Sequence, residues 1–88
     1  MMLKQNEKDI IKKLAKKYSA TQVILFGSAV DKKHYNDIDI GVSGIRPEKY
    51  FDFCGQLLYS LSKPVDVINL DKTSHFNSMV VKQGVRIA

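Results

Sequence analysis

Residues 22–42 read QVILFGSAVDKKHYNDIDIGV, and the predicted fold follows from this segment. The apolar, β-branched run 22–26 stops at a Gly-Ser pair, which predicts a buried strand that ends in a turn. The polar residues 31–36 are predicted to form a loop. From Asp37 onward the residues DIDIGV alternate polar and apolar side chains, which is the period of a strand with one face in the core. Ile38, Ile40 and Val42 are therefore expected to point inward.

Amphipathic helices are predicted on both sides of this segment. Apolar side chains recur at helical spacing in residues 6–18, with lysines between them, and Asn6 followed by Asp9 is a plausible N-terminal cap. Pro47 is well placed as the first residue of a second helix, which Gly55 weakens by about 1 kcal/mol. The apolar residues of this helix at core spacing are Tyr50, Phe51, Cys54, Leu57, Leu58 and Leu61.

The rest of the chain adds a third strand and a last helix. Residues 65–70 read VDVINL and predict a strand, and Ser74 can cap a short helix that Gly84 closes. Residues 85–87 are expected to add an edge strand. The predicted fold is thus a single α/β (α+β) domain over residues 1–88, with a small mixed sheet of three to four strands and helices packed against it.

Length and composition limit the class of protein. In a chain of 88 residues, a second core would leave each half too small to bury most of its apolar surface. No apolar run approaches the roughly 18–20 residues that span a bilayer, so we expect neither a membrane segment nor a membrane partner. The first residues, MMLKQNEKD, lack the apolar stretch of a secretory signal, and Cys54 has no intrachain partner for a disulfide. These features predict a soluble, cytoplasmic protein.

Basic residues are concentrated at the start of the chain. The net charge is +5, and of the 14 basic residues only Arg46 and Arg86 are arginines. Six lysines lie within the first seventeen residues: Lys4, Lys8, Lys12, Lys13, Lys16 and Lys17. These lysines could form a basic face that attracts phosphate groups or the acidic surface of another protein. Alternatively, they form an ordinary solvated helix face. Interleaved aromatic residues, which single-stranded nucleic-acid binders use, are missing from this segment.

Three aspartates occupy predicted strand positions, where aspartate is disfavoured. Asp37 and Asp39 lie two apart, so their carboxylates project from one face with α-carbons roughly 6.5–7 Å apart. At an effective dielectric near 20, two charges about 6 Å apart repel by roughly 3 kcal/mol, which a bound cation would offset. Asp66 adds a third carboxylate beside the sheet. Singly, the three could start a strand, face solvent or pair with a lysine; jointly, they fit ligands of two Mg²⁺ ions about 4 Å apart.

Gly27 and Ser28 are candidates for holding a nucleotide triphosphate. A glycine at the end of a strand lets the backbone approach a phosphate closely. A serine at the start of a helix offers its hydroxyl, backbone N–H groups and the positive end of the helix dipole. In isolation the pair indicates only a turn glycine and a capping serine. Its position just before the acidic strand is what makes it a candidate phosphate-binding site.

These motifs resemble the signature of a known family. Phe26-Gly27-Ser28, eight intervening residues, Asp37-Ile38-Asp39-Ile40 and a later Val65-Asp66-Val67 look like the pattern of the polymerase-beta-type nucleotidyltransferases. The resemblance spans nearly the whole chain. The length, the helix before the Gly-Ser strand and the segment from Asn69-Leu70-Asp71 through Lys82-Gln83-Gly84-Val85 resemble in particular the minimal nucleotidyltransferases (MNT), the antitoxins of HEPN/MNT toxin-antitoxin pairs.

The resemblance implies a role for each motif. Gly27 and Ser28 would contact the β- and γ-phosphates of ATP. Asp37 and Asp39 would bridge two Mg²⁺ ions, and Asp66 would complete the metal site at the acceptor oxygen or act as general base. The implied reaction is transfer of AMP from ATP to a tyrosine hydroxyl of a partner HEPN ribonuclease toxin, with release of pyrophosphate. Since such transfer needs mainly positioning and charge neutralisation, a small scaffold can provide it while a partner presents the acceptor.

The sequence departs from the family pattern just after the Gly-Ser pair. Many relatives carry an arginine-bearing segment there, whereas residues 29–31 read AVD in this chain. Lys32, Lys33 or His34 could replace that arginine, or they could be solvated loop residues. His34 and His75 otherwise have the character of surface histidines.

Two other functions stay open at this point. The same fold could neutralise a partner by stoichiometric contact, with the site holding only nucleotide or metal. Alternatively, the chain could transfer a nucleotide to RNA or to a small molecule, although enzymes of that kind usually carry additional domains that bind the acceptor. A homo- or hetero-oligomer is compatible with each of these functions.

Overall fold

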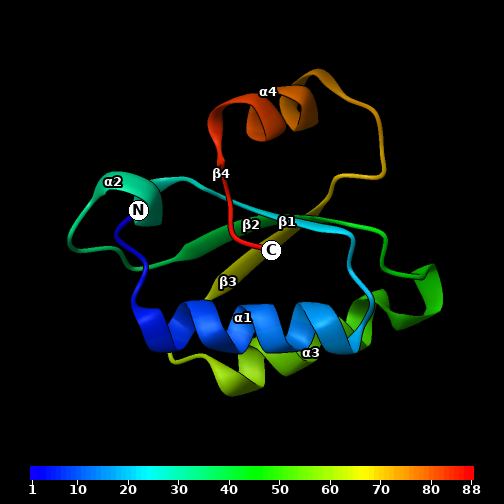
Figure 1. Ribbon diagram of the computed structural model, residues 1–88, viewed down its shortest axis with the longest axis horizontal. Helices are drawn as coiled ribbons and strands as arrows, with labels where there is room; N and C mark the ends of the chain where they lie inside the picture. Colours follow the sequence, from blue (N-terminus) through cyan, green and yellow to red (C-terminus); the bar gives the residue numbers. More distant parts are fainter.

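The computed structural model describes residues 1–88 as a four-stranded mixed sheet with helices on both faces (Figure 1). The elements are α1 (Gln5–Lys17), β1 (Gln22–Phe26), α2 (Ser28–Asp31), β2 (Ile38–Ser43), α3 (Pro47–Ser60), β3 (Val65–Asn69), α4 (His75–Gln83) and β4 (Val85–Arg86). The strand order is β3-β2-β1-β4, with β2 and β3 parallel and the other two pairs antiparallel. The predicted mixed sheet with helices packed against it is confirmed. None of the helices is long and apolar enough to cross a membrane.

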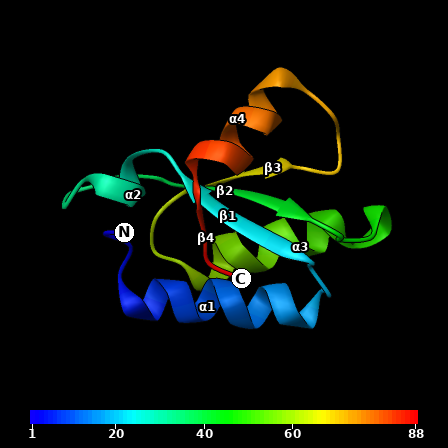
Figure 2. The same cartoon turned by 45° about the horizontal axis from the view of Figure 1, so that its top comes forward.

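The sheet separates two layers of helices. Figures 1 and 2 show α1 and α3 side by side under one face and α4 over the other. The main core lies between the sheet and the pair α1/α3, where Ile11 and Phe53 have no exposed surface. Ile38, Ile40 and Val42 of β2 point into this core, as predicted. Because side chains alternate along a strand, their neighbours project toward the α4 face.

The start of α1 differs from the prediction. The helix begins at Gln5 with Lys4 at the N-cap position, so the cap predicted at Asn6 is wrong. Glu7 supplies the capping interaction instead, because its carboxylate accepts a hydrogen bond of 3.3 Å from the backbone N–H of Lys4. A glutamate in the first turn commonly reaches back to the cap in this way.

The buried face of α3 is narrower than predicted. Phe51 and Leu58 were expected in the core, but their side chains are 84% and 58% exposed. Phe53 occupies the core position that the prediction missed, and Leu57 and Leu61 are buried as expected. The core-facing stripe therefore passes through 53, 57 and 61 at helical spacing, and Phe51 and Leu58 lie outside it and face solvent.

The end of α4 packs tightly against β1. The Ser74 hydroxyl caps the helix as predicted, since it accepts a 3.0 Å hydrogen bond from the backbone N–H of Asn77. Gly84 occupies the C-cap position, and the chain continues directly into β4, which pairs with Ile24 and Leu25 of β1. The short predicted edge strand is thus present, and it begins right after the helix ends.

Substitutions of Gly84 in the α4–β4 turn and of Gly55 in α3 are expected to change the free energy of unfolding in opposite directions. Gly84→Ala is expected to lower the free energy of unfolding by about 2 kcal/mol, because a Cβ would lie 2.7 Å from the carbonyl oxygen of Val80 and 2.8 Å from that of Leu25. Gly55→Ala is expected to raise it by about 1 kcal/mol, because no atom lies within 4 Å of its Cβ and alanine favours a helix. Urea denaturation measures both changes. A Gly84→Ala variant as stable as the parent would contradict the close approach of α4 to β1.

Candidate active site

The end of β1 and the acidic positions of β2 and β3 form a row across the sheet. The strand register places Phe26 beside Asp39 and Asp39 beside Asp66. Their neighbours Leu25, Ile38 and Val65 belong to the core under the sheet. The three side chains of the row therefore project to the opposite face, which carries α4.

The structure places the three predicted aspartates differently. Asp39 is half-buried within β2, and Asp66 is exposed on β3. Asp37 lies one residue before β2, in the exposed end of the loop, so the strand starts one residue later than predicted. No group of three or more His, Cys, Asp or Glu side chains is arranged closely enough to hold a metal ion. The structure thus brings Asp39 and Asp66 together and leaves Asp37 beside them.

The environment of Asp39 disfavours its ionised form. Burial is the largest cause that raises its pKa above the ordinary value of 3.8. The adjacent carboxyl group of Asp66 and the negative charge of Asp37 raise the pKa further. Carboxylates that repel one another in this way gain from a cation placed among them.

Gly27 lies directly against the acidic row. Its φ is +78°, in the region that favours glycine, and a Cβ at this position would overlap the Asp39 carboxylate. The backbone of the turn can therefore approach a ligand that also contacts Asp39. The following helix α2 is a single turn, so its dipole is small, and the half-buried Ser28 would offer a ligand only its hydroxyl and backbone N–H.

The loop after α2 carries the residues that were considered as replacements for the missing arginine. Lys32, Lys33 and His34 are all exposed. None of the three lines the open cavity that lies beside Gly27, between the end of β1 and α4. His75 is also exposed, as predicted, and Cys54 is partly buried against the core.

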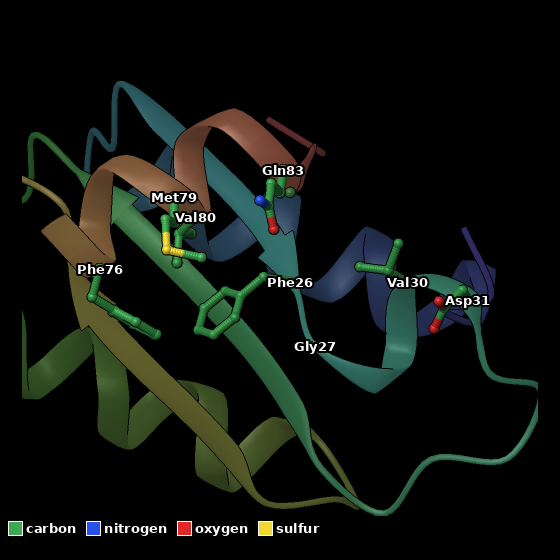
Figure 3. A pocket seen from close by; sticks show the side chains of 9 residues that line it. Phe26, Gly27, Val30, Asp31, Phe76, Met79, Val80 and Gln83 are labelled. Carbon is green, nitrogen blue, oxygen red and sulfur yellow. The ribbon is translucent and has the colours of Figure 1, made fainter.

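An open cavity of about 290 Å³ lies beside Gly27, between the end of β1, α2 and α4 (Figure 3). Its lining consists of Phe26, Gly27, Val30, Asp31, Phe76, Met79, Val80, Gln83 and Gly84. The rings of Phe26 and Phe76 meet edge to face, with centroids 6.0 Å apart and planes at 81°. The sequence did not predict this cavity, because it forms only where α4 crosses the sheet.

A buried polar cluster, formed by Glu7, Tyr35 and Lys63, holds the loops next to the site. Glu7 is only 3% exposed, and its carboxylate accepts hydrogen bonds from the Tyr35 hydroxyl and, at 2.9 Å, from Lys63 Nζ. Tyr35 lies in the loop before Asp37, and Lys63 lies just before β3. The cluster was not predicted, although Glu7 stands four residues before the buried Ile11 on the apolar face of α1.

A comparison with known families identifies the family of this chain. Residues 8–88 match the model of the family described as Polymerase beta, Nucleotidyltransferase. The chain belongs to this nucleotidyltransferase family. No curated protein matches it significantly in sequence.

Solved structures similar to this nucleotidyltransferase come from toxin-antitoxin complexes. A toxin-antitoxin structure with AMP-PNP contains a chain that is 26% identical, with a TM-score of 0.75 over 92% of this chain and 72% of the other. A complex of tri-AMPylated Shewanella oneidensis HEPN toxin with MNT antitoxin contains one that is 25% identical, with a TM-score of 0.75 over 98% and 72%. The MntA-HepT complex shares the fold at 23% identity, with a TM-score of 0.73 over 97% and 72%. The resemblance seen in the sequence motifs is thus confirmed.

Proposed function

We propose that this nucleotidyltransferase is an antitoxin that transfers AMP from ATP to a tyrosine hydroxyl of a partner HEPN ribonuclease toxin. The observation that carries the proposal is the contact between Gly27 and Asp39. A triphosphate held by the Gly27 backbone and the Ser28 hydroxyl would lie against the half-buried carboxylate of Asp39. The triphosphate and the Asp39 carboxylate are both negative, so they require a cation between them. Nucleotidyl transfer uses bound metal ions in this way.

The donor atoms of the acidic residues suit a hard divalent cation, although the three carboxylates do not by themselves form a closed metal site. Asp37, Asp39 and Asp66 offer only oxygen atoms, the donors that Mg²⁺ prefers. A cation among them would also reverse the rise in the pKa of Asp39. We assign the three residues as ligands of two Mg²⁺ ions, which when bound neutralise negative charge on the triphosphate and the transferring phosphorus.

In the proposed reaction the phenolic oxygen of the toxin tyrosine attacks the α-phosphorus of ATP. A bond forms between these two atoms, the bond from the α-phosphorus to the bridging oxygen breaks, and pyrophosphate leaves. Asp66, exposed on the edge strand β3, receives the phenolic proton. Because the attacking and leaving oxygens are roughly in line, the tyrosine approaches from the β3 side and pyrophosphate leaves toward Gly27 and Ser28.

Two of the similar structures support this reaction. One contains AMP-PNP, an analogue of ATP, and another contains a tri-AMPylated HEPN toxin with its MNT antitoxin. In this chain, the lysine-rich helix α1 covers the face of the sheet opposite to the acidic row (Figure 1). Those lysines are therefore not placed to guide RNA into the site, which favours a protein acceptor.

Transfer can be tested with ATP labelled at the α-phosphorus, Mg²⁺ and a HEPN protein from the same organism. Label is expected on a tyrosine of the HEPN protein, together with loss of its ribonuclease activity. ATP labelled at the γ-phosphorus serves as the matched control and is expected to transfer no label, because pyrophosphate is the leaving group.

The Asp37→Ala/Asp39→Ala double variant separates catalysis from stoichiometric inhibition. If the parent chain transfers no label and the double variant still inhibits the HEPN protein fully, the chain is a binding module and the proposed reaction is wrong. Label on RNA in place of protein would likewise contradict the assignment of the acceptor.

A further inference from the structure

We infer that the cavity beside Gly27 binds the adenine ring of the nucleotide, with Phe76 contacting the face of the base and Gln83 its polar edge. This inference rests on the proposed function, because it identifies where the base lies when ATP occupies the site. It assigns base recognition to α4, a helix that carries none of the aspartates or the Gly-Ser pair.

The position of the cavity matches the path of a nucleotide. Gly27 is shared between the cavity and the proposed phosphate site, and Phe26 is the member of the row next to Asp39. The base is tied through the ribose to the α-phosphorus, which the reaction requires at the acidic row. A base that leaves the row toward α4 would enter the cavity, whose lining residues are drawn in Figure 3.

The lining of the cavity suits an uncharged aromatic ring. Five of its nine residues are hydrophobic, and the cavity size of about 290 Å³ is near the lower end of ligand sites. The Phe76 side chain is 55% exposed on the cavity side of α4, and the Met79 side chain is 44% exposed. The carboxylate of Asp31 at the rim would repel phosphate groups. The cavity is thus better suited to the base than to the triphosphate.

Gln83 gives the cavity a means to recognise adenine. Its side chain projects from the last turn of α4 toward the space beside Phe26 (Figure 3). A glutamine amide has one donor and one acceptor group side by side, and this pair matches the amino group and ring nitrogen of adenine. The guanine edge presents a different order of donors and acceptors, so Gln83 is expected to favour ATP over GTP.

The toxin tyrosine is the other aromatic ring in the reaction, but the geometry disfavours it as the occupant. An in-line attack brings the acceptor from the side opposite to the leaving pyrophosphate. With the phosphates at Gly27, that side is the β3 edge near Asp66, whereas the cavity lies on the β1 side of the row.

Calorimetric titration of the full chain with ATP, GTP and inorganic tripolyphosphate in Mg²⁺ tests the inference. Phe76→Ala is expected to raise the Kd for ATP about tenfold and to leave the Kd for tripolyphosphate unchanged, because base stacking is lost and the phosphate contacts are kept. Gln83→Ala is expected to reduce the preference for ATP over GTP about tenfold. Phe51→Ala removes an 84% exposed phenylalanine on α3 and serves as the matched control, with no expected change.

The outcomes separate this inference from the proposed function. If the parent chain binds ATP but Phe76→Ala and Gln83→Ala bind ATP and GTP as the parent does, the base lies elsewhere while the proposed function stands. If the two variants instead raise only the KM for the HEPN protein, the cavity receives the acceptor and the inference is overturned. If the parent binds neither ATP nor tripolyphosphate, the proposed function fails and the inference fails with it. Melting curves identify any variant that does not fold.

Discussion

An Asp39→Asn variant is expected to lose about 10³-fold or more in kcat for AMP transfer, while its fold stays intact. Asp39 is the central member of the row, between Gly27 and Asp66, so loss of its negative charge weakens any cation held there. Removing several kcal/mol of charge stabilisation from the transition state gives a rate loss of this size. The rate of label transfer from α-labelled ATP at saturating Mg²⁺ measures the effect.

The same variant is expected to be as stable as the parent, or more stable, in the presence of a chelator. The pKa of Asp39 in the folded chain lies above its ordinary value of 3.8, so ionisation of this group destabilises the folded state as the pH rises through that folded pKa. Asparagine removes this cost at neutral pH, and the gain vanishes below pH 3.8, where the carboxyl group is protonated in both states. Thermal melting with EDTA at several pH values measures it.

Asp52→Asn provides the control for both measurements. Asp52 is exposed on α3, on the far side of the sheet from the row, and its replacement is expected to change neither transfer nor melting temperature. A large drop in the metal-free melting temperature of Asp39→Asn would show that the carboxylate has a structural role. Full transfer activity in that variant would exclude Asp39 from the reaction.

The parts of the fold that could be predicted are those encoded by local pattern. In β2, apolar residues at 38, 40 and 42 alternate with polar or small ones, and this period alone places Ile38 and Ile40 in the core and Asp39 on the opposite face. The neighbouring strands and the Ser74 cap of α4 follow from similarly short segments, whereas the cap predicted at Asn6 was wrong. The neighbouring position of Asp66 required more, because it depends on the parallel pairing of β2 with β3.

The features that could not be predicted depend on contacts between distant segments. On α3, Phe51 and Phe53 are both aromatic and both near the helical stripe, and only the packing of α1 against α3 decides that Phe53 is buried. The cavity beside Gly27 exists because α4 crosses the sheet above Phe26. The spacing of apolar residues specifies which face of a helix is apolar. Which helix or strand packs against that face depends on the tertiary fold.

Glu7 could have been recognised from the sequence as a charged residue on the apolar face of α1, and its substitution is expected to destabilise the fold strongly. We expect Glu7→Gln to lower the free energy of unfolding by about 2 kcal/mol at neutral pH. Burial alone would raise the pKa of Glu7, but hydrogen bonds from Tyr35, Lys63 and the Lys4 backbone, together with the charge of Lys63, lower it below the ordinary value of 4.5. Glutamine keeps the shape of the side chain but not its charge. Its NH₂ group would replace one of the carboxylate oxygens that accept hydrogen bonds, so a donor would face a donor.

The pH dependence distinguishes this buried cluster from simple packing. Because the folded pKa of Glu7 is lowered, its stabilisation is present above pH 4.5 and is lost as the pH falls through the folded pKa. The difference in stability between parent and Glu7→Gln should therefore shrink in acid, as urea denaturation at neutral and acidic pH would measure. Glu48→Gln is the matched control, since Glu48 pairs with Arg46 at 2.7 Å on the open surface, where such a pair contributes less than about 1 kcal/mol. Equal losses in the two variants at neutral pH would contradict the role of the cluster in fixing the loops that lead to Asp37 and Asp66.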